Sequence, residues 1–522
     1  MKRRGFLKRA GAASMLPLVL NKTQVFAHAL GSPFSQLASM ADNNDRVLVL
    51  VQLNGGNDGL NTVIPLNQYS NLAKARRNLL IPERKVIKFD TYVGLHPAMQ
   101  EMAEMYGEAK LGIVRGVGYP KPNFSHFRSA DIWKTASPAE EVWNTGWMGR
   151  YLEKLLPNYP IGYPNPDYPH PPAITIGSVV SSTCQGELLN LGMAVRNPDK
   201  FSALALTGVD ETPDSPYGYE LSYLRDMIGQ TNSYLESVKV ASDMGSNVYN
   251  QYPRGNRLAS QLQIVARLIA GGLKTKVYIV NMGGFDTHAN QAEDGEPTEG
   301  RHASLLGKLS TAIHAFQEDL RLMQLQHRVV GMTFSEFGRR IASNDSMGTD
   351  HGAAAPMFFF GTRVRNRIFG TNPEIPGEVA PRDNLPMQYD FRSLYGSVLM
   401  DWFGVEEEEI KSLLFPEFEY VPVIKGKNRA GGPIFERKVY MKQNYPNPFG
   451  NSTKIPIWLK EADTAQIRIF DGEGRLLETL MERDLPAGSH EITFNARDYS
   501  PGKYFFHVRV KHWHDMKVGI KT

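Results

Sequence analysis

Five short runs of apolar residues, none of them alternating with polar ones, constrain the fold of this chain more than any other feature. A strand with one face in water alternates apolar and polar residues, whereas a strand covered on both faces is apolar throughout. The runs therefore predict central strands of a mostly parallel sheet with helices on both faces. They are Val47–Leu53, Leu111–Arg115, Val277–Val280, Val329–Phe334 and Met357–Phe360.

A helix is expected between the third and fourth runs, because apolar residues recur at helical spacing from Leu305 to Met323. A strand, a helix and a further strand at this spacing predict a right-handed βαβ unit in an α/β fold. Pro157–Pro172 is rich in Pro, Tyr and Asn and is expected to be an irregular surface segment. The α/β domain is predicted to span residues 45–425.

The pattern changes after a polar, glycine-containing linker that is predicted at residues 426–436. Beyond the linker, apolar and polar residues alternate, as in Gln466–Phe470 and Lys503–Val510. Tyr504, Phe506 and Val508 then share one face of a strand. Residues 437–522 are therefore expected to form a small all-β, immunoglobulin-like sandwich.

This last segment resembles the C-terminal sorting domain of type IX secretion cargo. The resemblance is carried by Gln443–Phe449, the Asp471–Gly474 turn and Tyr499–Tyr504. In that family the domain directs passage through the outer membrane, so the resemblance implies the type IX secretion machinery as a partner. The alternative is a plain immunoglobulin-like module that packs on its neighbour.

Residues 1–27 are expected to be a signal peptide. The basic stretch Lys2–Arg9 precedes the apolar stretch Ala10–Leu20, and small residues allow cleavage after Ala27 or Ala29. Paired arginines followed by Gly-Phe-Leu-Lys resemble the twin-arginine consensus, which implies the twin-arginine translocase as a partner. An ordinary leader for the unfolded-chain route is the alternative. Either route predicts an extracytoplasmic protein that is periplasmic, on the cell surface or secreted.

Charge and composition exclude several classes of protein. Six of the 58 Lys and Arg residues lie in the leader, which has no acid, so 52 basic and 54 acidic residues remain, a net charge of −2. No basic footprint for nucleic acid remains. No later stretch of about 18 apolar residues predicts a membrane span. Cys184 is the only cysteine, so an internal disulfide is excluded.

Polar residues follow the predicted strands where ligands bind to an open α/β sheet, at the carboxyl ends. Carboxylates and imidazoles among small neighbours are ligands for divalent metals such as Zn²⁺, Mn²⁺ or Mg²⁺. Ser125 is a candidate nucleophile, because it lies where a loop enters a predicted helix and an anion is favoured there. Arg128 lies one turn further on and is expected to face the same anion. The candidate metal ligands are Asp58, Asp286, His288, Glu336, Asp350 and His351.

Each residue also has a structural interpretation. Asp58 suits an Asx turn and Ser125 a helix N-cap. His288 suits a loop hydrogen bond, and Glu336 an ion pair with a following arginine. His302 and Cys184 are expected to be structural. The functional interpretation rests on the occurrence of these groups together at successive strand ends.

The same segments resemble the domain-of-unknown-function 1501 family of twin-arginine-exported proteins, which shares the core of the alkaline phosphatase and sulfatase superfamily. The segments are Leu53–Leu60, Asn123–Phe127, Gly146–Arg150, Gly283–His288, Ser335–Arg339, Asp350–Pro356 and Asp390–Arg392. The resemblance implies an alkaline phosphatase-like fold with Asp58, Asp286, His288 and His351 as metal ligands and Ser125 as nucleophile. It places Glu336 and Phe337 where the superfamily has an Asp-His pair.

The leading hypothesis is an exported metal-dependent hydrolase of phosphate or sulfate esters. It requires a divalent metal, with Zn, Mn, Mg and Ca left open, and a small anionic ester as substrate. The alternative is a non-catalytic cell-surface protein that uses the same scaffold to bind a glycan or a partner. The sequence leaves open whether the chain is an enzyme.

Overall fold

The computed structural model describes residues 17–20, 23–26, 45–200, 216–426, 439–441, 444–459, 461–471, 475–510 and 513–522. Most of the predicted signal peptide and most of the predicted linker lie outside these residues. Two strands in the leader are described, β1 (Pro17–Leu20) and β2 (Thr23–Phe26), and they pair antiparallel. In the described part of the chain, no helix is both long and apolar enough to cross a membrane.

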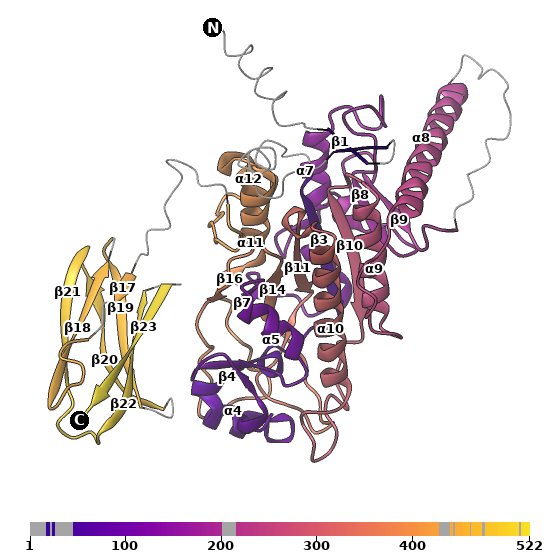
Figure 1. The fold of residues 1–522 in the computed structure, drawn as a ribbon. Helices are drawn as coiled ribbons and strands as arrows, with labels where there is room; N and C mark the ends of the chain where they lie inside the picture. Colours follow the sequence, from indigo (N-terminus) through magenta and orange to yellow (C-terminus); the bar gives the residue numbers. More distant parts are fainter. Residues whose placement is uncertain are drawn as a thin grey trace, which may run out of the picture. The chain divides into compact units, whose positions relative to one another are not determined.

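A nine-stranded sheet forms the framework of the large domain (Figure 1). Its order is β15-β7-β14-β11-β3-β10-β8-β9, and β16 also pairs with β7. In this order the strands are Ile368–Phe369, Leu111–Gly118, Ala355–Phe360, Val329–Ser335, Val47–Asn54, Val277–Gly283, Ala173–Ile176 and Gly192–Val195, with β16 at Tyr389–Asp390.

The sheet is mostly parallel, as the sequence predicts, and β14 is the exception. It runs antiparallel to both of its neighbours, β7 and β11. The prediction of a parallel strand at Met357–Phe360 is therefore wrong in direction. An apolar run reports burial on both faces, and burial carries no information about which way the strand runs.

The central strand β3 shows why the apolar runs do not alternate. It pairs in parallel with β10 on one side and β11 on the other. Leu48 and Leu50 enter one hydrophobic core, whereas Val47 and Val49 enter a second core on the opposite face. Successive side chains of a strand point to opposite faces, so both sets must be apolar.

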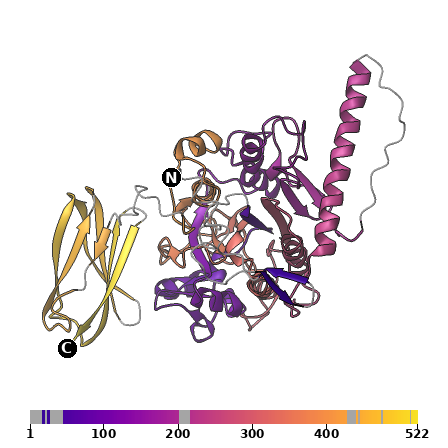
Figure 2. The ribbon, with the colours of Figure 1, turned by 45° about the horizontal axis from the view of Figure 1, so that its top comes forward.

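Helices cover both faces of the sheet (Figures 1 and 2). One core packs against α5 (Gln100–Gly107), α9 (Arg257–Ala270) and α10 (Arg301–Leu322). The other packs against α6 (His126–Thr135), α7 (Trp147–Leu155) and α11 (Phe391–Val398). Helix α10 confirms the expected amphipathic helix, and it connects β10 to β11, which lie on either side of β3. Smaller elements are α3 (Gly59–Thr62), β4 (Val63–Pro65), α4 (Tyr69–Ala75), β5 (Ile87–Lys88), β6 (Val93–Leu95), α8 (Pro216–Met244), β12 (Gly338–Arg339), β13 (His351–Gly352) and α12 (Glu407–Leu413).

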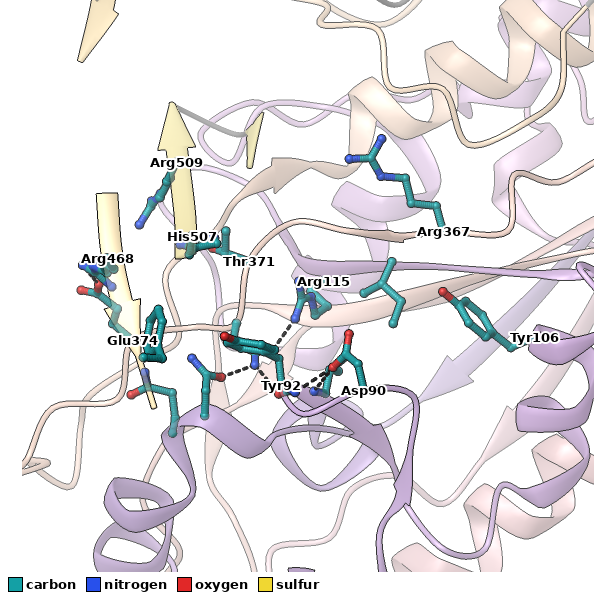
Figure 3. A pocket seen from close by; sticks show the side chains of 16 residues that line it. Asp90, Tyr92, Tyr106, Arg115, Arg367, Thr371, Glu374, Arg468, His507 and Arg509 are labelled. Carbon is teal, nitrogen blue, oxygen red and sulfur yellow. Dashed lines mark hydrogen bonds and ion pairs between the residues drawn. The ribbon is translucent and has the colours of Figure 1, made fainter. Parts of the chain in front are cut away.

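A buried arginine fastens the β7 edge of the sheet. Arg115 on β7 donates to the carbonyl oxygen of Gly370 and to the amide oxygen of Asn372, which follow β15. Figure 3 shows its side chain beside Asp90 and Tyr92. Burial lowers the pKa of Arg115 to about 10, so the guanidinium stays charged at neutral pH. Its two acceptors hold the segment after β15 against β7.

The C-terminal strands form two antiparallel sheets, β17-β18-β21 and β20-β19-β22-β23. Tyr504, Phe506, Val508 and Val510 on β22 are all buried in one hydrophobic cluster. The expected all-β segment and the shared face are thereby confirmed. The strands are β17 (Val439–Met441), β18 (Ser452–Leu459), β19 (Asp463–Phe470), β20 (Leu476–Leu485), β21 (Gly488–Asn495), β22 (Gly502–Val510) and β23 (Trp513–Lys521).

Two buried histidines in the large domain are expected to lower its free energy of unfolding at acid pH. His302 on α10 donates from Nε2 to the amide oxygen of Asn57, 3.1 Å away. Burial lowers the pKa of His302 to about 4 and that of His96 to about 3. An unfolded imidazole binds its proton near pH 6.5, so between about pH 6.5 and 4 the unfolded chain binds more protons than the folded one.

The free energy of unfolding is therefore expected to be constant above about pH 7 with respect to these groups and to fall as the pH drops toward 4. The variant His302→Gln should show a shallower fall, measured by urea unfolding at several pH values between 4.5 and 7.5. Equal slopes in the variant and the parent chain would contradict the assignment.

Candidate metal centre

Side chains from four connections meet at one edge of the sheet. His126 begins α6 after β7, Asp286 and His288 follow β10, Glu336 follows β11, and His351 begins β13. Strands β7, β10 and β11 all point their carboxyl ends to this edge. His351 reaches the edge because β14, which follows it, runs the other way and starts there.

Three imidazoles direct their Nε2 atoms toward the carboxylate of Asp286. The Nε2 atoms of His288 and His351 each lie 3.2 Å from Oδ1 of Asp286. The Nε2 atom of His126 lies 3.4 Å from Oδ2. One carboxylate is therefore surrounded by three ring nitrogens. Within the described residues, His126, Asp286 and His351 offer ligand atoms that all lie within 4.8 Å of one another.

The other nitrogen of each imidazole is already occupied. Nδ1 of His126 lies 2.9 Å from Oε1 of Glu336, and Nδ1 of His288 lies 3.2 Å from Oδ1 of Asp350. Nδ1 of His351 lies 2.8 Å from the carbonyl oxygen of Phe124. These oxygens only accept hydrogen bonds, so each Nδ1 carries a proton and Nε2 is the atom that each ring directs at Asp286.

The Nε2 atoms of His288 and His351 are 2.9 Å apart. Two unprotonated ring nitrogens at that distance repel unless a proton or a metal cation lies between them, and the carboxylate of Asp286 adds a third acceptor. Imidazoles that face a cation with Nε2 and are oriented by an acceptor at Nδ1 are the usual arrangement in protein metal sites.

Asp286 is charged at neutral pH. Its partial burial alone would raise the pKa, but the hydrogen bonds of Arg339 and His351 and the charges of Arg339 and His288 outweigh that effect and lower the pKa to about 2. Nη2 of Arg339 donates to Oδ1 of Asp286 over 2.8 Å. Burial lowers the pKa of His351, which favours the neutral ring that a metal requires.

Arg339 is a fully buried cation that joins the loops around the centre. It donates from Nε to the carbonyl oxygen of Gly56 over 2.8 Å and from Nη1 to that of Thr349 over 2.6 Å. A further bond of 3.0 Å reaches the carbonyl oxygen of Phe285. The loops after β3 and β10 and the segment before β13 are therefore fixed by one side chain.

Gly55 shows how closely these loops approach. Its φ of +123° is disfavoured for residues with a side chain, and a Cβ atom would lie 2.2 Å from the backbone nitrogen of Asp286. Only glycine fits at this position. The backbone nitrogen of Gly55 also donates to Oε1 of Glu336 over 2.7 Å, so the same oxygen orients both this loop and His126.

Asp58 does not join the cluster. Its carboxylate is fully buried and accepts two bonds of 2.8 and 2.9 Å from Nη1 of Arg76. Gln291 donates to it over 2.6 Å, and the backbone nitrogen of Leu60 over 3.2 Å. Burial would raise the pKa of Asp58, but the charge of Arg76 outweighs it and lowers the pKa. Its lone pairs are taken up within the protein.

Ser125 and Arg128 differ in where they lie. Ser125 directly precedes His126, is exposed, and makes no side-chain capping bond to α6. Arg128 points to the loop after α6, where it pairs with Asp131 and donates to the carbonyl oxygens of Pro138 and Ala139, 3.2 Å each. Ser125 is thus the sequence neighbour of one histidine of the cluster, whereas Arg128 binds the loop after α6.

His126 was not among the predicted site residues. It lies in the segment Asn123–Phe127, in which only the neighbouring Ser125 was predicted to be functional. Because α6 begins at His126, the ring projects from the first turn toward the strand ends. The aromatic ring of Phe337 packs on it and on His351, with ring centroids 5.0 and 4.3 Å apart. Phe337 supports two histidines and offers no ligand atom itself.

Comparison with known proteins identifies the family. The family model described as "Protein of unknown function (DUF1501)" matches residues 111–414, more than half of the 522-residue chain. The chain belongs to the DUF1501 family. A second family model, "Secretion system C-terminal sorting domain", matches residues 443–518 of this DUF1501 protein. No curated protein matches it.

Several solved structures are similar to this DUF1501 protein. One is a protein in the alkaline phosphatase superfamily from Vibrio parahaemolyticus, with 10% identity, a TM-score of 0.31, and coverage of 80% of this chain and 76% of that chain. A sulfatase from Pseudoalteromonas sp. has 10% identity and a TM-score of 0.33, covering 90% and 89%. A phosphonate monoester hydrolase from Silicibacter pomeroyi has 9% identity and a TM-score of 0.31, covering 91% and 88%.

The Asp58–Arg76 pair predicts a stability effect that separates it from the metal centre. The variant Arg76→Met leaves a buried carboxylate without its cation, and we expect the free energy of unfolding to fall by about 3–5 kcal/mol. The exposed pair of Lys85 and Glu296 supplies a control, because Lys85→Met should change stability by less than about 1 kcal/mol. Denaturant unfolding monitored by circular dichroism measures both, and equal small effects would contradict the structural role of Arg76.

Proposed function

We propose that this DUF1501 protein is an exported metal-dependent hydrolase of phosphate or sulfate esters. The observation that carries the proposal is the approach of the Nε2 atoms of His288 and His351 to 2.9 Å, with each of them 3.2 Å from the carboxylate of Asp286. A metal cation bound by these three groups would make this contact favourable. It lies at the strand ends, where an open α/β sheet binds its ligands.

The residues present fit a divalent metal. His126, His288, His351 and Asp286 supply three nitrogens and one carboxylate, a donor set that suits Zn²⁺ and also other divalent transition metals. A bound divalent cation would supply Lewis-acid polarisation of an ester oxygen. Glu336, Asp350 and the carbonyl of Phe124 hold the imidazoles in the tautomer that binding requires.

Four side chains around the proposed metal site have separate roles. Arg339 holds Asp286 in place and keeps its carboxyl group ionised, and Glu336 orients His126. Ser125 is the proposed nucleophile, because its hydroxyl is exposed on the residue before a ligand and is not used to cap α6. The position of Phe337, packed on two of the rings, favours a single cation in this centre.

Export supports the assignment of compartment. The match of residues 443–518 to a secretion sorting domain implies a cell-surface or secreted protein. We further propose that the twin-arginine translocase carries the chain across the inner membrane, on the basis of the Arg3-Arg4 leader. That route transports folded proteins, so the metal would be bound before export.

Metal binding is the first test of the proposal. The purified chain is expected to hold about one divalent ion, measured by mass spectrometry of the metal content after dialysis. Asp286→Asn and His351→Ala each remove a ligand and should lower the affinity by at least about 100-fold, because removing even an outer-shell partner costs 10–100-fold. His490→Ala, at a half-buried histidine of β21, is the matched control and should leave the metal content unchanged. A chain that holds no metal, or loses none in the two ligand variants, contradicts the centre.

Hydrolysis of 4-nitrophenyl phosphate and 4-nitrophenyl sulfate tests the reaction itself. We expect turnover of at least one ester that depends on added metal, and we expect Ser125→Ala to reduce kcat by about 10³-fold or more, because the nucleophile forms the covalent intermediate. Metal binding without turnover of either ester would favour the alternative, a non-catalytic binding protein on the same scaffold. Turnover that Ser125→Ala leaves intact would exclude this serine as nucleophile.

A further inference from the structure

A cavity of about 450 Å³ lies directly beside the metal centre. It shares two walls with the centre, because His126 and Glu336 line both. The remaining polar wall comes from Gln52 and Asn54 at the end of β3 and from Lys134 on α6. Its volume is within the range of about 300–1,000 Å³ that small-molecule sites occupy. We refer to it below as the His126 cavity.

Glu336 lines the His126 cavity and has one unpaired oxygen. Its side chain is only 4% exposed, and Oε1 is taken up by Gly55 and His126. Oε2 is buried and has no hydrogen-bond partner among the described residues. Leaving a buried carboxylate oxygen unpaired costs free energy, so this atom requires a donor from a ligand or from water.

Lys134 places an opposite charge in the same cavity. No carboxylate of the described residues pairs with its ammonium group, although Glu336 and Asp131 are near enough to influence it electrostatically. Asp131, which also lines the cavity, pairs with Arg128. Burial lowers the pKa of Lys134. The cavity is therefore lined by two carboxylates and one ammonium group, and of the carboxylates only Asp131 is paired with an arginine.

These charges select the chemistry of the occupant. An anionic group would be repelled by Glu336, and a cationic group would be repelled by Lys134. A hydroxyl group suits both, because it donates to a carboxylate and accepts from an ammonium group. The amide side chains of Gln52 and Asn54 also donate and accept, so each can bind a hydroxyl group in either sense.

An aromatic side chain completes the His126 cavity. Phe127 lines it and is 91% exposed, although burying such a ring would be favourable. A pyranose ring has an apolar face of C–H groups and an edge of hydroxyl groups. It would therefore cover the ring of Phe127 while its hydroxyl groups reach the polar wall.

We propose that the His126 cavity binds a sugar ring, so that the substrate is a carbohydrate ester. The sugar would occupy the cavity while its ester group lies at the adjoining centre. The ester part of this inference rests on the function proposed above, whereas sugar binding in the cavity does not depend on catalysis.

Binding is tested with the full chain and a panel of methyl glycosides of glucose, galactose, mannose and fucose, by saturation-transfer NMR and titration. At least one glycoside is expected to bind, with its ring protons saturated. Phe127→Ala should weaken that binding about fivefold, the size of an aromatic contact. Lys134→Met should weaken it about tenfold, the size of a charged hydrogen bond. Ile161→Ala, at another exposed apolar side chain, is the matched control and should have no effect.

Four results would overturn the inference. The first is that no glycoside of the panel binds, and the second is that mannitol binds as well as the best glycoside. The third is that inorganic phosphate or sulfate displaces the best glycoside, and the fourth is that N-acetylated dipeptide amides bind instead of the glycosides. The metal-free variant His351→Ala separates this inference from the proposed function, because it should still bind the glycoside. Glycoside binding without ester hydrolysis would leave the inference standing and refute the hydrolase. Ester hydrolysis without glycoside binding would refute the inference and leave the proposed hydrolase standing.

Discussion

The edge of the sheet is held together by the buried guanidinium of Arg339. A fully buried cation is costly unless its donors are all used, and here they reach carbonyl oxygens from three separate loops and the carboxylate of Asp286. The same interaction fixes the position of Asp286 and keeps it ionised. The histidines can converge on this carboxylate only because it is held in place.

A second layer of contacts decides what the histidines can do. Each imidazole has its Nδ1 bound to an acceptor, so its Nε2 is the atom directed at Asp286. Glu336 belongs to both sites, because its Oε1 orients His126 and its side chain also lines the adjoining cavity. The centre and the cavity are thus neighbours through a shared side chain.

Much of the fold was predictable from the sequence, because burial on both faces leaves a direct record in the apolar runs. All five runs are strands, and the amphipathic repeat is α10. The direction of β14 was not predictable, since an apolar run is the same in either direction. That direction matters, because His351 precedes β14 and lies at the edge with Asp286 only if β14 starts at that edge.

The candidate site was predictable in part. Asp286, His288, Asp350 and His351 meet, as their places at strand ends suggested. Asp58 was expected with them, but its partner Arg76 is a basic residue among many in the sequence, and nothing local shows that the two are buried together. His126 was missed by one position, because a serine before a helix is the more familiar signal.

The reversal of β14 has a consequence for how the centre forms. Residues 336–351 leave β11 and return to β14 without leaving this edge, and β12 pairs with β13 along the way. Glu336, Arg339, Asp350 and His351 therefore arrive on one contiguous hairpin, while Asp286 and His126 come from elsewhere. If that hairpin unfolds locally, the centre loses His351, Arg339 and the two carboxylates that orient its imidazoles. In the proposed metal centre, cation binding would therefore be coupled to the ordering of this single stretch of sixteen residues.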